Sequence, residues 1–342
     1  MSERIQDIAQ KLVANGQGIL AADESTGTIQ KRFDSINVEN TEQNRRDYRQ
    51  MLFTTEDAMR DYISGVILFE ETLFQKTEDG TPLVEIMKAA GSIPGIKVDR
   101  GAHALPGSSE EKVTEGLDGL RDRLQKYHAA GARFAKWRAV INISKNTPTN
   151  NCTKANTHAL ARYAALCQEN GIVPIVEPEV VMDGPNSTHT IDRCAEVTAW
   201  ALDAQFAELR DAGVDLEGMI LKPNMIVPGQ NCPTQASIDE VAEKTVRCFK
   251  NHVPAVIPGI AFLSGGQSDE LATAHLSAMN AQFDLPWQLT FSYGRALQAA
   301  ALKAWGGKTE NVAAAQRAFR HRAKMNAMAA TGSWQKALEK AA

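Results

Sequence analysis

The sequence predicts an α/β protein in which eight parallel strands alternate with helices and close into one (β/α)8 TIM barrel. Three observations lead to this prediction. Short runs rich in Val, Ile and Leu recur along the 342 residues, helical patterns separate them, and no Pro/Ser-rich linker divides the chain. Continuous apolar runs are typical of strands covered by helices on both faces. An open, doubly wound sheet is the alternative, although no Gly-x-Gly-x-x-Gly motif follows the first run.

The predicted strands are short, and most of them end at a charged residue. They are Gly18–Asp23, Gly65–Glu70, Gly95–Asp99, Ala132–Arg138, Ile172–Glu177, Met219–Lys222, Pro254–Pro258 and Trp287–Phe291. Strands that alternate with helices form right-handed βαβ units. Eight such units favour closure of the sheet into a barrel.

Helical patterns fill the segments between these runs. The clearest are Leu117–Ala130, Lys154–Asn170, Cys194–Ala212, Ile238–Asn251 and Asp269–Met279, with stops predicted at Gly171 and Gly213. The alanine-rich end, from about residue 303, predicts a helix that runs into a tail. We therefore expect one domain over residues 1–342, with a C-terminal tail from about residue 325.

Composition narrows the classes of function. A net charge of −4 gives no signal for nucleic acid, and no apolar run approaches the ~18 residues of a membrane span. The N-terminus lacks the apolar core of a secretory signal. Five cysteines without Cys-x-x-Cys spacing and seven scattered histidines argue against a disulfide framework and a metal cluster. We expect a cytoplasmic protein that needs no metal and no cofactor.

Lys222 is the most informative single residue. It ends the run Met219-Ile-Leu-Lys, where burial would favour the neutral amine, a nucleophile for carbonyl groups. A structural ion pair is the commoner interpretation of a lone buried lysine. The other strand ends favour catalysis, because the C-terminal ends of barrel strands converge on one mouth. They supply Asp23, Lys97, Lys136, Arg138, Glu177, Glu179, Lys222, Ser264 and Arg295.

Spacing within the strands groups these residues further. Residues two apart on a strand face the same side, which pairs Lys136 with Arg138 and Glu177 with Glu179. Two close carboxylates favour protonation of one of them, and this glutamate would suit acid and base catalysis. Lys136 and Lys222 would likewise disfavour each other's charge. A neutralising network of Lys–Glu ion pairs is the alternative interpretation.

Two groups of residues have the character of phosphate sites. Ser264, Gly265 and Gly266 precede a predicted helix, and Ser292, Gly294 and Arg295 occupy the next strand-to-helix corner. Bare backbone amides beside a helix start bind anions, and these loops follow the seventh and eighth strands. A second, more basic group consists of Ser25, Thr28, Lys31, Arg32 and Lys97. If Ser25, Thr28, Arg32 and Lys97 gather at the mouth, they would bind another phosphate. We place Arg45 and Arg46 on a solvated helix face.

These residues lie in motifs that resemble class I fructose-bisphosphate aldolases. The resemblance extends to about residue 325. The motifs begin at Gly18 (GILAADESTG), Gly65 (GVILFEETL), Phe134 (FAKWR), Asn170 (NGIVPIVEPE), Leu221 (LKPNM), Gly259 (GIAFLSGGQ) and Leu289 (LTFSYGRAL). The resemblance implies a TIM barrel that reversibly cleaves fructose 1,6-bisphosphate in glycolysis and gluconeogenesis, and a homotetramer.

The resemblance also implies roles for individual residues. Lys222 would form the Schiff base, Glu177 would act as its acid and base, and Asp23 would accept the C4-hydroxyl proton. Lys136 would orient the substrate hydroxyls, with Glu179 in support. The C1-phosphate would bind Ser264, Gly265, Gly266, Ser292, Gly294 and Arg295. The C6-phosphate or the sugar would bind Ser25, Thr28, Arg32, Lys97 and Arg138.

One departure from the family pattern concerns proton transfer at C3. Animal members end in a tyrosine linked to this step, whereas the last tyrosine here is Tyr293. Glu177 or a bound phosphate would then protonate C3, and preference between fructose 1,6-bisphosphate and fructose 1-phosphate is open. Another Schiff-base enzyme, such as a transaldolase or deoxyribose-phosphate aldolase, is the second interpretation. A barrel used only for binding fits the charged strand ends less well, and the histidine spacing disfavours a metal-dependent aldolase.

Overall fold

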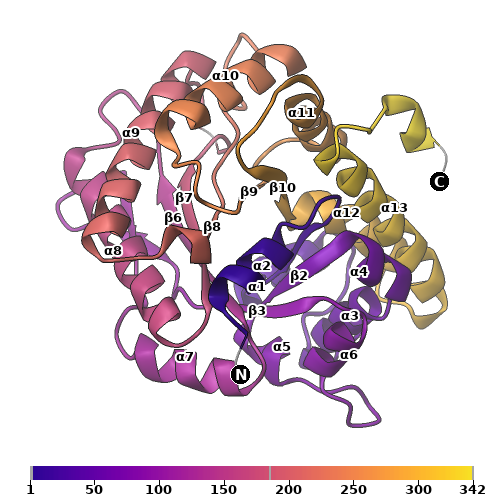
Figure 1. Cartoon of the computed structure of the whole chain (residues 1–342). Coiled ribbons are helices and arrows are strands. Elements are labelled where there is room, and N and C mark those ends of the chain that lie inside the picture. Colours follow the sequence, from indigo (N-terminus) through magenta and orange to yellow (C-terminus); the bar gives the residue numbers. More distant parts are fainter. Residues whose placement is uncertain (1–2, 185, 341–342) are drawn as a thin grey trace.

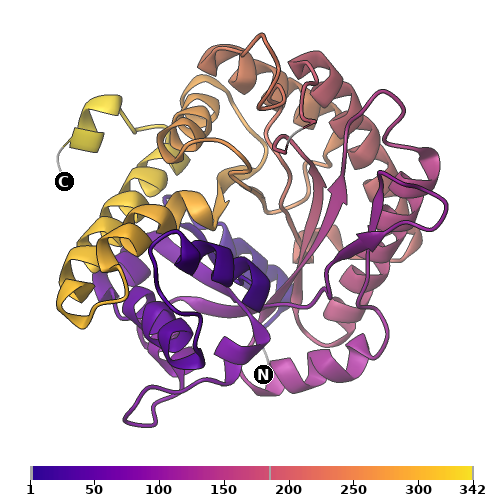
Figure 2. The ribbon, with the colours of Figure 1, turned by 180° about the vertical axis from the view of Figure 1, so that it is seen from behind.

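Within residues 3–184 and 186–340, which the computed structural model describes, eight parallel strands form a closed barrel inside a ring of helices (Figures 1 and 2). In chain order the barrel strands are β1 (Gly18–Ala22), β2 (Ile63–Leu68), β3 (Ile93–Lys97), β6 (Phe134–Ile141), β7 (Val173–Val180), β8 (Ile220–Leu221), β9 (Gly259–Phe262) and β10 (Gln288–Tyr293). β1 pairs with both β2 and β10, which closes the sheet. The predicted fold class is confirmed.

Helices connect successive strands and cover the outside of the barrel, except that α1 precedes β1 and packs against the N-terminal end. They are α1 (Ile5–Leu12), α2 (Thr26–Asp34), α3 (Glu42–Phe53), α4 (Glu56–Tyr62), α5 (Glu70–Phe74), α6 (Leu83–Ala89), α7 (Leu120–Ala129), α8 (Asn150–Glu169), α9 (Ile191–Asp211), α10 (Ile238–His252), α11 (Asp269–Gln282), α12 (Arg295–Trp305) and α13 (Val312–Ala330). Short 3-10 turns add η1 (Leu216–Gly218), η2 (Thr309–Asn311) and η3 (Lys336–Lys340). No helix of the described residues is long and apolar enough to cross a membrane.

Local chemistry sets where several helices begin and end. The side chains of Thr149, Thr190, Ser237 and Ser268 each accept a hydrogen bond from a backbone N–H in the first turn of the helix that follows. Such caps satisfy amides that have no partner within the helix. The predicted stops also hold, because α8 and α9 end two residues before Gly171 and Gly213.

One predicted strand is wrong. Pro254–Pro258 forms a turn, and the strand β9 begins one residue later, at Gly259. Proline has no N–H to donate to a neighbouring strand, so a run bounded by two prolines is a poor ladder segment. An antiparallel ribbon that the sequence did not predict, β4 (Ala102–Ala104) with β5 (Lys112–Thr114), follows β3 beside the barrel mouth.

The barrel interior is apolar at one end and charged at the other. At the N-terminal end, Ile8 and Leu12 of α1 pack with Phe134 and Ile175 and fill the space between the strands. A Cβ on Gly95 would lie 2.3 Å from the Phe134 ring, so glycine is required beside that side chain. The packed end supports β6 and β7 rigidly as they continue toward the charged end.

Candidate active site

A cavity of about 420 Å³ opens where the C-terminal ends of the barrel strands meet. All the predicted site residues line it except Gly266: Asp23, Ser25, Thr28, Arg32, Lys97, Lys136, Arg138, Glu177, Glu179, Lys222, Ser264, Gly265, Ser292, Gly294 and Arg295. Among the residues that the structure describes, its lining includes six basic and six acidic side chains. The empty cavity is therefore close to electrically neutral.

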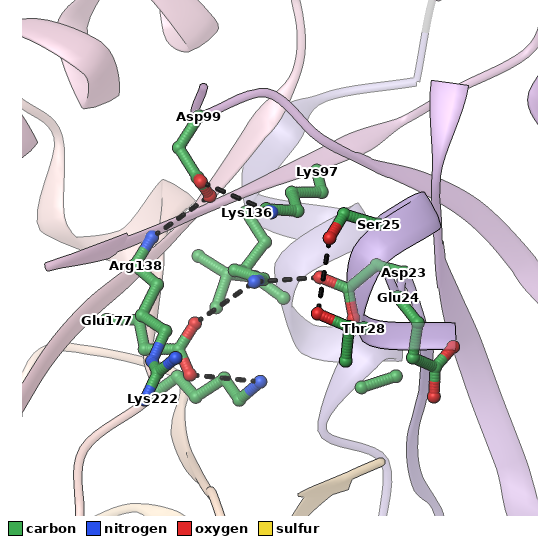
Figure 3. A network of polar contacts seen from close by, with 12 residues as sticks. Asp23, Glu24, Ser25, Thr28, Lys97, Asp99, Lys136, Arg138, Glu177 and Lys222 are labelled. Carbon is green, nitrogen blue, oxygen red and sulfur yellow. Dashed lines mark hydrogen bonds and ion pairs between the residues drawn. The ribbon is translucent and has the colours of Figure 1, made fainter. Parts of the chain in front are cut away.

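Lys222 immediately follows β8, and its backbone N–H donates to Val176 O at 2.8 Å. This bond fixes the lysine against β7, where its Nζ lies 3.2 Å from Oε1 of Glu177 (Figure 3). Both side chains are about 95% buried. A carboxylate at this distance can take the proton that the amine must lose before it attacks a carbonyl.

Glu177 is shared between two lysines. Its Oε2 lies 3.5 Å from Nζ of Lys136, and that same ammonium lies 2.8 Å from Oδ2 of Asp23. Figure 3 shows Lys136 between the two carboxylates. The chain Lys222–Glu177–Lys136–Asp23 therefore alternates in charge along the floor of the cavity.

This alternation corrects two expectations. Burial disfavours the ionised carboxylate of Glu177, but the ammonium groups of Lys222 and Lys136 outweigh burial and lower its pKa. Burial also disfavours the charged form of Lys136, but Asp23 and Glu177 outweigh it and raise the Lys136 pKa. Lys136 therefore does not favour its neutral form as predicted, because carboxylates lie between it and Lys222. Likewise, burial opposes ionisation of Asp23, yet Lys136 and Lys222 hold its pKa well below the usual range.

Glu179 faces the same side of β7 as Glu177, as its spacing predicted, but it has a different partner. Its Oε2 accepts a hydrogen bond from Nε of Arg138, which attraction to Glu179 keeps charged by raising the Arg138 pKa. The arginine side chain is 45% exposed, whereas Glu179 is buried. Glu179 therefore holds the Arg138 side chain, whereas Glu177 pairs with Lys136 and Lys222.

Four members of the second basic group also line the cavity, namely Ser25, Thr28, Arg32 and Lys97. Nζ of Lys97 lies 3.4 Å from Oδ1 of Asp99, and Ser25 Oγ lies 3.2 Å from Thr28 Oγ1 (Figure 3). Lys31 is exposed and does not line the cavity. Of the pair placed on a solvated face, Arg45 is instead partly buried and makes two hydrogen bonds to the carboxylate of Glu71. Arg46 pairs with Asp47 and with exposed Glu78.

The loop after β9 has the backbone of an anion site. Gly265 has a φ of +54°, and a Cβ there would lie 2.6 Å from Sδ of Met182. A Cβ on Gly266 would lie 2.8 Å from Cβ of Asp183, which explains that glycine although it does not line the cavity. Only glycine combines the left-handed conformation with this close packing. The loop therefore exposes bare backbone at the start of α11.

Arg295, in the corner after β10, braces this loop. Its guanidinium donates to the carbonyl oxygens of Gly265, at 3.1 Å, and Gln267, and it lies 3.2 Å from Oδ1 of Asp269. Ser292 Oγ is buried and has no hydrogen-bond partner among the described residues. The cradle predicted from two separate motifs is thus one continuous surface.

The sequence did not single out Glu24 and Asp99, which line the cavity, or Asp269, which pairs with Arg295 of the lining. Glu24, Asp99 and Asp269 each lie within 3.4 Å of one basic residue, respectively Arg32, Lys97 and Arg295. The pairing of Asp99 with Lys97 had a signal in the two-residue spacing along one strand end. The other two pairs join different elements and had no local signal. No group of three or more His, Cys, Asp or Glu is arranged for a metal ion in the described residues.

The chain is similar to known proteins of one family over nearly its whole length. Residues 4–342 match the family profile described as "Fructose-bisphosphate aldolase class-I". The chain is 58% identical to a probable fructose-bisphosphate aldolase class 1 of Xanthomonas axonopodis pv. citri, over 97% of this chain and 98% of that protein. It is 56% identical to fructose-bisphosphate aldolase 4, cytosolic, of Arabidopsis thaliana, over 93% and 80% respectively.

A solved structure has the same fold. It is fructose-bisphosphate aldolase from Plasmodium falciparum in a ternary complex with TRAP and a small-molecule inhibitor. It aligns with a TM-score of 0.94 and 50% identity, covering 97% of this chain and 95% of that one.

Proposed function

The chain belongs to the class I fructose-bisphosphate aldolases, lyases of glycolysis, and from this premise we propose which of its residues carry out each step. The substrate is fructose 1,6-bisphosphate, cleaved to dihydroxyacetone phosphate and glyceraldehyde 3-phosphate, and the reverse addition serves gluconeogenesis. The observation that carries the proposal is the buried contact of 3.2 Å between Lys222 Nζ and Glu177 Oε1. It joins a nucleophile to its base.

Lys222 attacks the C2 ketone after passing a proton to Glu177. The carbinolamine then loses water as Glu177 returns that proton to the departing hydroxyl, which leaves a protonated imine on Lys222. In the neutral carbinolamine Lys222 is no longer an ammonium, so Glu177 keeps only Lys136 and Arg138 as the cations that lower its pKa. Its affinity for protons rises at the step where it must carry one.

Cleavage uses the other half of the charged chain. Asp23 accepts the C4-hydroxyl proton, the C3–C4 bond breaks, and its electron pair flows into the imine to form an enamine. Lys136, 2.8 Å from Asp23, stabilises the developing C4 alkoxide. Protonation at C3 and hydrolysis then release dihydroxyacetone phosphate and regenerate Lys222. No metal and no cofactor are required.

The remaining residues bind the ends of the substrate. We assign the C1-phosphate to the loop of Ser264, Gly265 and Gly266 with Ser292, Gly294 and Arg295. We assign the C6-phosphate to Ser25, Thr28 and Lys97, and the sugar body to Arg138 with Glu179. The cytoplasm is the proposed location, in line with the cytosolic name of the Arabidopsis relative. A homotetramer built from one domain of residues 1–342 is the proposed assembly.

Trapping of the imine tests the proposal. The protein is incubated with dihydroxyacetone phosphate, reduced with borohydride, and searched for a mass adduct by peptide mapping. We expect an adduct on Lys222 and loss of activity. The matched control is Lys88, an exposed lysine on α6 paired with Glu85, which stays unmodified. If activity survives borohydride and Lys222 carries no adduct, the Schiff-base assignment is wrong.

A further inference from the structure

Glu24 is a buried carboxylate that the steps above do not use. It follows Asp23 directly and lines the cavity, but its side chain points away from Lys136 (Figure 3). It is 7% exposed, and its Oε2 has no hydrogen-bond partner among the described residues. Burying a carboxylate costs free energy unless a cation or a hydrogen-bond donor pairs with it, so Glu24 requires such a partner.

A rigid chain of hydrogen bonds fixes this carboxylate. Gln298 donates from Nε2 to Glu24 Oε1 at 3.0 Å and to Ala21 O at 2.7 Å. Its Oε1 accepts from the hydroxyl of Tyr48 at 3.0 Å. Tyr48 and Gln298 are almost fully buried, so neither can turn toward water. The Glu24 carboxylate is therefore already fixed in position before any substrate binds.

The group placed next to Glu24 Oε1 is Arg32, whose Nε lies 3.4 Å away. Arg32 projects from α2 into the cavity. A Cβ on Gly294 would lie 3.8 Å from Nη2 of Arg32 and 3.3 Å from Ala21 O. The guanidinium thus lies against the Gly294–Arg295 corner, although sequence reasoning grouped Arg32 with Ser25, Thr28 and Lys97.

We propose that Glu24 and Gln298 are positioning residues that hold Arg32 at the Gly294–Arg295 corner, where it binds the same phosphate monoester as that corner. The inference rests on the function proposed above. A guanidinium binds phosphate best with its planar fork already oriented, and the Tyr48–Gln298–Glu24 chain supplies that orientation. A purely structural interpretation is that Glu24 balances the buried Arg49, whose Nη2 donates to Glu24 O at 2.9 Å.

The direction in which Glu24→Gln changes the affinity for phosphate separates these two interpretations. Glu24→Gln removes a negative charge close to the phosphate, so Coulomb's law alone predicts tighter binding. Loss of orientation predicts the opposite, about tenfold weaker binding, because the close ion pair between Glu24 Oε1 and Arg32 Nε is lost. Inorganic phosphate is the probe, titrated calorimetrically. Glu85→Gln on exposed α6 is the matched control and should bind like the wild type.

Gln298→Leu gives a second, independent test because it leaves every charge in place. We expect it to weaken inorganic phosphate in the same direction as Glu24→Gln and to raise KM with kcat within about twofold. Thermal unfolding of both variants checks that the fold is retained. Phosphate binding that is unchanged or tighter in Glu24→Gln overturns the proposal, and so does Gln298→Leu with wild-type affinity.

A double-mutant cycle shows whether Glu24 acts through Arg32. Because both residues serve one interaction, Glu24→Gln with Arg32→Ala should bind phosphate no more weakly than Arg32→Ala alone. Additive losses overturn the proposal. Phosphate titration measures binding alone, so its outcome does not depend on imine formation. Borohydride trapping tests the Schiff base on Lys222, and the two proposals can therefore fail separately.

Discussion

Nζ of Lys222 and Oε1 of Glu177 lie 3.2 Å apart inside the barrel, and neither side chain exposes more than 5% of its surface. The pair is formed by adjacent strands and is fixed by the bond from Lys222 N to Val176 O. The distance of 3.2 Å between Nζ and Oε1 allows direct proton transfer without an intervening water.

Glu177→Gln should lower kcat by about 100- to 1,000-fold, because an amide cannot take up and return the proton of imine formation. The expected signature is slower trapping of dihydroxyacetone phosphate by borohydride, with weak effects on KM. Glu179→Gln is the comparison, since Glu179 pairs with Arg138 and should chiefly alter KM. Wild-type trapping rates in Glu177→Gln would contradict the assigned role.

Asp23→Asn should lower the free energy of unfolding at pH 7 by about 2 kcal/mol, because it leaves buried Lys136 with only Glu177. The ordinary Asp pKa is 3.8, and that of native Asp23 is lower. Below pH 3.8 the unfolded chain therefore binds more protons, and the contribution of the wild-type carboxylate is lost as pH falls. The difference in free energy of unfolding between the wild type and Asp23→Asn should therefore become smaller below pH 3.8. Chemical denaturation between pH 7 and pH 3 measures it, and a constant gap would disprove the linkage.

Gly265→Ala should destabilise the protein by about 1–3 kcal/mol, since its φ of +54° is strained for alanine and its Cβ meets Met182. Inorganic phosphate should also bind more weakly. Gly27→Ala is the matched control, because that residue lies in α2 with nothing within 4 Å of its Cβ position. It should be neutral or slightly stabilising. Equal melting temperatures for the two variants would refute the argument.

Glu339 anchors the C-terminal turn η3 on α13. Its carboxylate accepts hydrogen bonds from buried Arg322 and, at 2.9 Å, from Nε1 of Trp334. Glu339→Gln should destabilise the protein by about 3 kcal/mol because it leaves Arg322 buried without its carboxylate. Arg322→Met in the same chain should restore part of the loss. Additive destabilisation in the double variant, measured by thermal unfolding, would speak against the ion pair.

The sequence predicted the barrel because strands and helices alternate with a period that local patterns reveal. It misplaced only the seventh strand, where the apolar run Pro254–Pro258 lies outside the ladder. Residues at strand ends, such as Lys222 and Glu177, could be found because the barrel brings all such ends to one mouth. The gathering of these residues in one cavity could therefore be predicted from topology.

The supporting contacts could not be predicted in this way. Glu24 meets Gln298 across 274 positions of sequence, and Asp269 meets Arg295 from the neighbouring unit. Nor could residue types reveal that Asp23 and Glu177 lie on either side of Lys136, which reversed the expected direction of its pKa shift. Such facts depend on which side chains meet in three dimensions, and local periodicity contains no information on that.

The equal numbers of acidic and basic side chains that line the cavity, six of each among the described residues, have a thermodynamic consequence. A substrate with two phosphate dianions brings about four negative charges into an already neutral space. Binding should then draw protons from solution, onto the phosphates or onto carboxylates displaced from their cations. The heat of binding would vary with the ionisation enthalpy of the buffer, so complex formation would consume acid even though the overall cleavage reaction releases none.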